Sequence, residues 1–281
     1  MQSILAASFL NTPWGMAVFI ILDIAVFILI AALNYRWLFK RLFDILFSAV
    51  FLAVFLPFFL IFLGVDALYN RTANAYRSLF EHTEYCGKKE KPFRASVLST
   101  ERVLHDEAGA LLPEEERITR FGKFLKGSGL KYYPMLALVF LGRMSFVGPV
   151  PMTAEDAAAL APERKVRFSV RPGLVSSLSR YGGEKLTYAD MFEEDEEYVR
   201  HINLFRDLAF FMTRLAQKVR GEKSNNLGEV AKRSYIEACL AEGTLTEEEA
   251  EAIRRDVAER AVRRSSAAEE KKRFQERDML R

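Results

Sequence analysis

Two long runs of apolar residues lie close together near the start of the chain. The first, residues 17–33, contains one charged side chain, Asp23, and the second, residues 45–63, contains none. A helix needs about 20 apolar residues to cross the hydrocarbon core of a bilayer. The pattern therefore predicts an N-terminal transmembrane helix with its exit at 1–37 and a second membrane-embedded helix at 38–66.

The flanks of the first run argue against a cleaved signal peptide and indicate an orientation. Residues 1–16 contain no Lys or Arg, whereas Arg36, Lys40 and Arg41 follow the run. A signal peptide would start with basic residues and end at a small-residue cleavage site. Because short loops rich in Lys and Arg stay on the cytoplasmic side, the first helix is expected to run from outside to inside.

The second run contains Pro57, which lacks a backbone donor and is expected to kink a helix. If the helix turns back at this residue, it is re-entrant and the main domain stays in the cytoplasm. If it crosses as a kinked transmembrane helix, the main domain lies outside. The residues alone leave both possibilities open.

The remaining sequence is more polar and predicts a small domain at 67–222. A turn at 88–93 predicts a β-hairpin. The basic and aromatic stretch at 118–142 predicts an amphipathic helix in the plane of the membrane interface, followed by an apolar helix. An ordinary core-facing helix is the alternative for this stretch. The fold class expected for the whole chain is α+β and mainly helical.

Residues 223–281 predict a C-terminal helical extension that begins with a linker, SNNLG. Such an extension is either a solvated tail or a docking module for a partner. The net charge of +3 is small and indicates no nucleic-acid partner; the basic residues near the apolar runs suit anionic lipid headgroups better. Cys86 and Cys239 lie far apart without metal-ligand spacing, which is typical of reduced cytoplasmic thiols.

The most informative stretch is LKYYPMLALVFLGRMSFVG at 130–148. Together with KRLFD at 40–44, KEKPFR at 89–94, ERITRFGKFLKGSGL at 116–130 and RFSVRPGLVS at 167–176, it resembles the bacterial sugar transferases. These are monotopic phosphoglycosyl transferases, which load a sugar-1-phosphate onto polyprenyl phosphate. The segments keep the family's order and near-constant spacing, so the resemblance covers about residues 38–222.

This resemblance implies a bacterial inner-membrane protein whose second apolar run is re-entrant. It assigns four residues to the motif of the membrane helix: Lys40, Arg41, Asp44 and Pro57. It also implies membrane lipid, and polyprenyl phosphate in particular, as a partner. For a member that does not catalyse the transfer, the expected protein partner is an active sugar transferase homologue or another glycan-assembly protein.

The two positions of the family's Asp-Glu dyad hold Lys131 and Tyr132. In the family, the aspartate attacks the phosphate of a nucleotide sugar, and the glutamate and Mg²⁺ assist. A lysine is a cation near neutral pH and a tyrosine is neutral, and an ammonium offers no oxygen ligand to Mg²⁺. The resemblance therefore predicts no catalytic residue, no metal site and no cofactor, with Mg²⁺ expected if the chain is active after all.

Other polar positions of the family site are changed as well. The family's Lys-Phe-Arg-Ser strand reads VLST at 97–100, its Pro-Arg-Pro holds Val150, and its Gly-Asp-Met-Ser aspartate is Arg143. The candidates that remain for phosphate or a lipid headgroup are Arg117, Arg120, Lys131, Ser145 and Gly148. The candidates for a nucleotide loop are Pro172 and Gly173.

Three functions are consistent with this pattern. The first is a membrane-anchored, catalytically inactive homologue that acts as a partner or regulator in polysaccharide or glycolipid biosynthesis. The alternative is an active transferase with rearranged catalytic residues, drawing on acids such as those at 114–116 or 193–197. The third is a lipid-binding scaffold that never contacts a nucleotide.

Overall fold

The two apolar runs form two long helices. The computed structural model describes residues 12–72, 79–102, 104–105, 112, 114–181, 186–220 and 233–279. Helix α2 (Pro13–Leu33) begins at Thr12, whose side chain accepts from the Gly15 N–H at 3.0 Å, as a helix N-cap does. By length and composition, α2 and α3 (Lys40–Thr72) could each cross a membrane.

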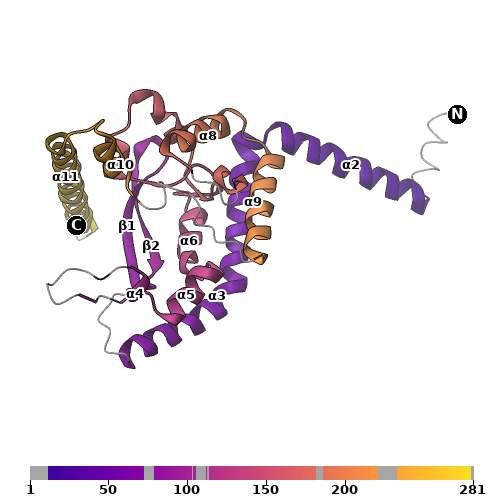
Figure 1. Ribbon diagram of the computed structural model, residues 1–281. Coiled ribbons are helices and arrows are strands. Elements are labelled where there is room, and N and C mark those ends of the chain that lie inside the picture. Colours follow the sequence, from indigo (N-terminus) through magenta and orange to yellow (C-terminus); the bar gives the residue numbers. More distant parts are fainter. Residues whose placement is uncertain are drawn as a thin grey trace.

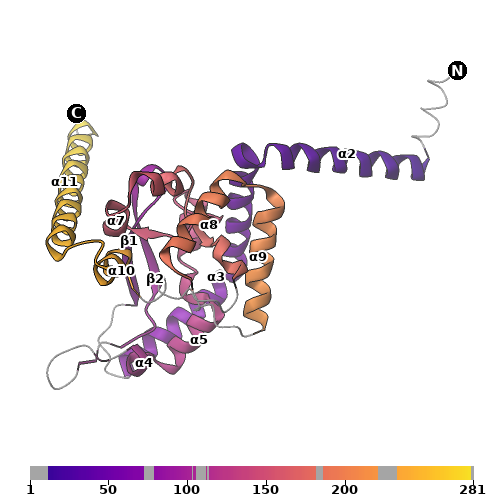
Figure 2. The same ribbon diagram turned by 45° about the horizontal axis from the view of Figure 1, so that its top comes forward.

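The two helices differ in how they relate to the rest of the molecule. Helix α2 projects away from the body in both views (Figures 1 and 2), and nearly all of its side chains are exposed. Helix α3 runs along the body and changes direction near its middle, where Pro57 removes a backbone hydrogen bond. It continues to Thr72, beyond the predicted end at residue 66.

The body is mostly helical with a small sheet, as the predicted α+β class requires. Strands β1 (Phe80–Cys86) and β2 (Pro92–Leu98) form an antiparallel hairpin around the turn at 88–90, which confirms the predicted hairpin. Strand β4 (Met152–Thr153) pairs with the end of β1. A second, parallel pair joins β3 (Ser145–Val147) to β5 (Gly173–Val175).

Short helices connect these strands and surround them. The core fills the space between the hairpin, the β3–β5 pair and the helices that cover them. This arrangement brings the start of α3 together with the end of the helix at Met135–Phe140 and with the helices at Tyr188–Arg200 and Leu204–Val219. The helices of the body are α4 (Glu114–Arg117), α5 (Arg120–Ser128), α6 (Met135–Phe140), α7 (Ala154–Ala158), α8 (Tyr188–Arg200) and α9 (Leu204–Val219).

The C-terminal extension contains α10 (Tyr235–Glu242) and α11 (Glu247–Met279), on the side of the body opposite to α2 (Figure 1). Its beginning is packed: Ile236 is 1% exposed, and its N–H donates to the Asp156 carboxylate at 3.1 Å. The extension is therefore not solvated along its whole length. The predicted boundary at 222–223 lies outside the described residues.

Candidate functional site

The two positions of the family dyad lie in a 3₁₀ turn, Leu130–Tyr132, between α5 and α6. Gly129 precedes the turn with φ of 81°, a left-handed conformation that glycine adopts at little cost. The Lys131 ammonium lies 3.3 Å from the Glu81 carboxylate, which comes from the start of β1. The Tyr132 side chain is 47% exposed. The turn thus presents an ion pair and a phenol where the family has two carboxylates.

Glu81 also has a defined neighbour on the other strand of the hairpin. In the register of β1 with β2 it lies opposite Val97, so the two side chains share one face of the sheet. By the resemblance, Val97 occupies the first of the two positions on this strand that hold basic residues in the family. The negative charge at this place therefore comes from β1, and the positive charge from the turn that precedes α6.

The next residue in the turn, Tyr133, supports the bend of α3. Its ring stacks on Phe59, with centroids 4.3 Å apart, and its hydroxyl donates to the Leu52 carbonyl at 2.6 Å. Leu52 lies five residues before Pro57, in the turn whose backbone bonding a proline disturbs. The carbonyl that Pro57 leaves without its helical partner is that of Ala53, so Tyr133 ties the neighbouring turn of α3 to the body and does not replace the missing bond.

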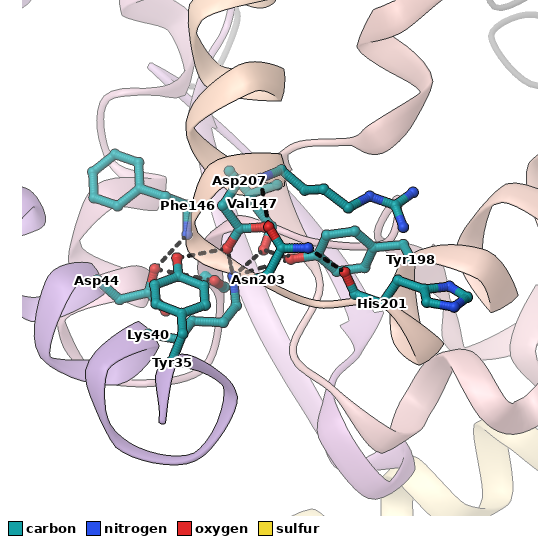
Figure 3. A network of polar contacts seen from close by, with 11 residues as sticks. Tyr35, Lys40, Asp44, Phe146, Val147, Tyr198, His201, Asn203 and Asp207 are labelled. Carbon is teal, nitrogen blue, oxygen red and sulfur yellow. Dashed lines mark hydrogen bonds and ion pairs between the residues drawn. The ribbon is translucent and has the colours of Figure 1, made fainter. Parts of the chain in front are cut away.

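The start of α3 is joined to the body by a buried polar network (Figure 3). The Lys40 ammonium contacts the Asp207 carboxylate, and it donates to the Tyr198 hydroxyl and the Val147 carbonyl, both at 3.0 Å. The Tyr198 and Tyr35 hydroxyls donate to Asp207 at 2.8 and 2.7 Å. Burial and the Asp207 charge raise the pKa of Tyr198 well above its ordinary value, so the phenol remains a donor.

The other polar residues of the membrane-helix motif also bind the body. The Arg41 guanidinium donates to the Val139 and Phe140 carbonyls, both at 2.7 Å, and so satisfies the open end of α6. The Asp44 carboxylate accepts from the Ser145 hydroxyl and from the Phe146 N–H, both at 3.0 Å. These three motif residues therefore fasten α3 to the helix and strand behind it.

The predicted phosphate and nucleotide candidates are spread over the body. Arg117 forms an ion pair with Glu101 at 2.9 Å and donates to the Leu112 carbonyl, whereas Arg120 is exposed at the start of α5. Ser145 donates to Asp44, as described above. Their predicted binding roles stay predictions, and the structure does not bring these side chains together around Lys131.

The glycines of the two candidate loops make a close backbone contact. Gly148 and Gly173 face each other so closely that a Cβ on either would collide with the backbone of the other. The Gly148 N–H donates to the Val175 carbonyl at 3.0 Å, which extends the β3–β5 pairing. Pro172 is buried beside them and accepts from the Ser145 N–H at 2.9 Å. Packing of this loop accounts for the small residues here.

Two features were missed in the sequence. One is a stripe of exposed apolar side chains on α9, a helix that lies beside α3 in both views (Figures 1 and 2). Its alternating spacing of three and four residues is a helical signal that the sequence did contain. The stripe consists of Phe205, Leu208, Met212, Leu215 and Val219.

The second missed feature is a basic cavity at the turn of the hairpin. It combines the turn at 88–91 with Arg143 and Arg171, from three separate segments. Only the three lysines of the turn form a visible cluster in the sequence. The arginines reach the cavity because β3 and β5 pair and because α6 ends beside the hairpin.

Comparisons with known proteins agree with the sequence resemblance. The model of the bacterial sugar transferase family matches residues 35–221. The chain is 30% identical over 122 residues to the uncharacterized sugar transferase EpsL of Bacillus subtilis, a match that covers 43% of this chain and 60% of EpsL.

Two further relatives carry more specific names. The UDP-glucose:undecaprenyl-phosphate glucose-1-phosphate transferase of Caulobacter vibrioides is 34% identical over 102 residues, which covers 34% of this chain and 38% of that protein. The undecaprenyl-phosphate galactose phosphotransferase of Salmonella typhimurium is 26% identical over 129 residues, which covers 42% of this chain and 27% of that protein. The matches thus span less than two thirds of each relative.

Proposed function

This chain belongs to the bacterial sugar transferase family, and we propose that it is a membrane-associated member that has lost the transfer reaction. In this proposal it acts as a partner or regulator in polysaccharide or glycolipid biosynthesis. Its relatives carry the names of enzymes that act with undecaprenyl phosphate. Polyprenyl phosphate and membrane lipid are therefore the first ligands to consider, and an active homologue is the first protein partner.

The observation that carries the proposal is the Lys131–Glu81 ion pair. By the resemblance, an active member has acids at 131 and 132 and basic residues on the facing strand, at 97 and 99. Here the turn supplies the positive charge and the hairpin supplies the negative charge. The pair keeps the local charge balanced, but a lysine at position 131 lacks the carboxylate nucleophile that the family reaction requires.

The donors at this place do not fit Mg²⁺. This cation prefers several oxygen ligands in octahedral geometry. The turn offers an ammonium and a neutral phenol, and the nearby Glu81 carboxylate is already engaged by Lys131. We therefore assign no step of a reaction to a metal ion at this position.

A transfer assay tests the proposal. The full-length chain in lipid nanodiscs, supplied with nucleotide sugars, Mg²⁺ and undecaprenyl phosphate, is expected to release no nucleoside monophosphate above background. The Caulobacter vibrioides relative, assayed with UDP-glucose under the same conditions, is the positive control. Release by the unmodified chain would establish a rearranged mechanism and overturn the proposal.

A variant refines this assay. Lys131→Asp with Tyr132→Glu restores the family's acids, and activity in this variant alone would show that the surrounding pocket is still competent. If neither chain releases nucleoside monophosphate and thermal unfolding shows both to be folded, the result fits a site that has changed at several places.

We further propose that α3 is re-entrant and that the body faces the cytoplasm. The bend near Pro57, supported by Tyr133, and the basic residues that follow α2 favour this arrangement. In whole cells, a cysteine at position 2 should react with an impermeant thiol reagent, whereas a cysteine at position 223 should not. Labelling of both positions from outside would show instead that α3 crosses the membrane.

A further inference from the structure

The basic cavity has a volume of 370 Å³ and lies between the turn of the hairpin and the end of α6. Five of its eight lining residues are cationic, and none is acidic. A cavity beside α11, by contrast, combines Glu90 and Asp256 with its basic lining residues. The lining of the basic cavity consists of Gly87, Lys88, Lys89, Lys91, Phe93, Gly142, Arg143 and Arg171.

The positive charge of the cavity is not balanced within the part of the chain that the structure describes. In that part, no hydrogen bond or ion pair involves the side chains of Lys88, Lys89, Lys91 or Arg143. Glu90, the acid of the same turn, instead forms an ion pair with Lys165 at 3.2 Å. The cluster thus lacks the internal counter-ion that would make it a structural feature of the fold.

The walls of the cavity are held in place by other contacts. Arg171 donates from Nε to the Gly142 carbonyl at 2.7 Å, and Arg41 of α3 satisfies the carbonyls at the end of α6 beside it. Lys89 adopts φ of 59°, which places this lysine in a backbone conformation that L-residues seldom adopt. The cations therefore line a cavity whose backbone is held in place by other contacts.

We propose that this cavity binds a phosphate-bearing group, supplied by an anionic lipid headgroup or by a soluble phosphate compound. Phosphate oxygens are strong acceptors, and Arg and Lys side chains bind them through charge-assisted hydrogen bonds. Burial and the neighbouring charges of Arg171, Lys89 and Arg36 lower the pKa of Lys88, and an anion bound beside it would act in the opposite direction.

The surroundings of the cavity suit a lipid headgroup. Leu141, next to Gly142, is 69% exposed, and Phe140 is also exposed, so apolar surface adjoins the cationic surface. Arg36, whose charge acts on Lys88, follows α2 directly. An anionic lipid could place its phosphate in the cavity and its chains along this apolar surface.

This site is separate from the dyad position. Glu81 lies at the start of β1 and Gly87 follows its end, so the strand separates the two places by about 20 Å at 3.3 Å per residue. The inference goes beyond the proposed function, because phosphate binding here does not depend on whether the transfer reaction is lost.

The test uses the full-length chain in nanodiscs and a double variant, Lys89→Gln with Arg143→Gln. Neither side chain has an intramolecular partner among the described residues, so the fold should persist. Arg255→Gln with Arg263→Gln, on the exposed surface of α11, is the matched control, because it also removes two positive charges. One arm titrates inorganic pyrophosphate in phosphatidylcholine nanodiscs, and the other compares nanodiscs with and without phosphatidylglycerol. Thermal unfolding reports binding in both arms, because a ligand of the folded state raises the midpoint.

The midpoint of the unmodified chain should rise in at least one arm. A rise with phosphatidylglycerol identifies a headgroup as the source of the phosphate, and a rise with pyrophosphate identifies a soluble compound. The cavity double variant should lose this response, with affinity about tenfold weaker for each charge-assisted contact removed, while the α11 double variant should keep it. No rise in either arm, an unchanged response in the cavity variant or an equal loss in the α11 variant would overturn the proposal.

Discussion

The start of α3 and the turn before α6 both match the same family, but only the start of α3 keeps the family's polar residues in this chain. At the start of α3, Lys40 and Asp44 keep partners on the strand and helices behind them. In the turn before α6, the acids of the family are replaced by Lys131 and Tyr132. The contrast indicates that the residues that fasten α3 to the body can be kept while the residues at the dyad position change.

Burial explains this difference. Asp207, at the centre of the network in Figure 3, is 5% exposed and accepts from Tyr35, Lys40 and Tyr198. Removing any one of them leaves a buried polar group without one of its partners. Glu81, by contrast, is 41% exposed at its side chain, so water can replace Lys131 as its partner. The fold therefore constrains the first region much more strongly than the second.

The largest expected effect is at Asp207. Asp207→Ala should lower the free energy of unfolding by about 3–5 kcal/mol, because it leaves the Lys40 charge buried without its carboxylate. Thermal and chemical unfolding in detergent would measure this loss. Asp256→Ala, which breaks an exposed ion pair with Arg260 on α11, is the control and should cost at most about 1 kcal/mol. Equal costs for the two variants would remove the distinction between the regions.

A smaller effect is expected at the bend of α3. Tyr133→Phe keeps the ring against Phe59 but removes the donor to the Leu52 carbonyl, and should cost about 1–2 kcal/mol. The adjacent Tyr132→Phe removes an exposed hydroxyl and should leave the unfolding midpoint almost unchanged. If both variants behave alike, the hydroxyl of Tyr133 does not stabilise the bend.

The smallest effect is expected at the ion pair itself. Lys131→Gln, Glu81→Gln and the double variant form a cycle whose coupling energy should be below about 1 kcal/mol. Unfolding measurements on the four chains determine this value. A coupling of several kcal/mol would mean that the turn before α6 is constrained by the fold as strongly as the start of α3.

Much of the fold could be predicted from local patterns. The apolar runs form α2 and α3, and the turn at 88–93 joins β1 to β2, because such elements depend on neighbouring residues. The role of the membrane-helix motif could not be predicted in the same way. Lys40 and Asp207 lie 167 positions apart, and no local pattern indicates that they meet.

In the candidate sites, too, contacts between distant parts of the sequence could not be predicted. The sequence placed Lys131 in the family's reactive position, but the pairing with Glu81 depends on how the hairpin lies against the turn. The basic cavity depends on segments around residues 88, 143 and 171 that only the folded chain brings together. The ligand roles predicted for Arg120, Ser145 and Gly173 stay predictions: the contacts of Ser145 and Gly173 serve the fold, and Arg120 is exposed at the start of α5.

The central claim is that position 131 no longer supports the family's covalent step, and intact-mass measurement tests it most directly. After incubation with nucleotide sugars and Mg²⁺ but without polyprenyl phosphate, the unmodified chain should keep its mass, since neither Lys131 nor Tyr132 is a carboxylate. The Caulobacter vibrioides relative, incubated with UDP-glucose, should gain the mass of a phospho-sugar. The same gain on the unmodified chain, located by peptide mapping to any carboxylate, would contradict the account.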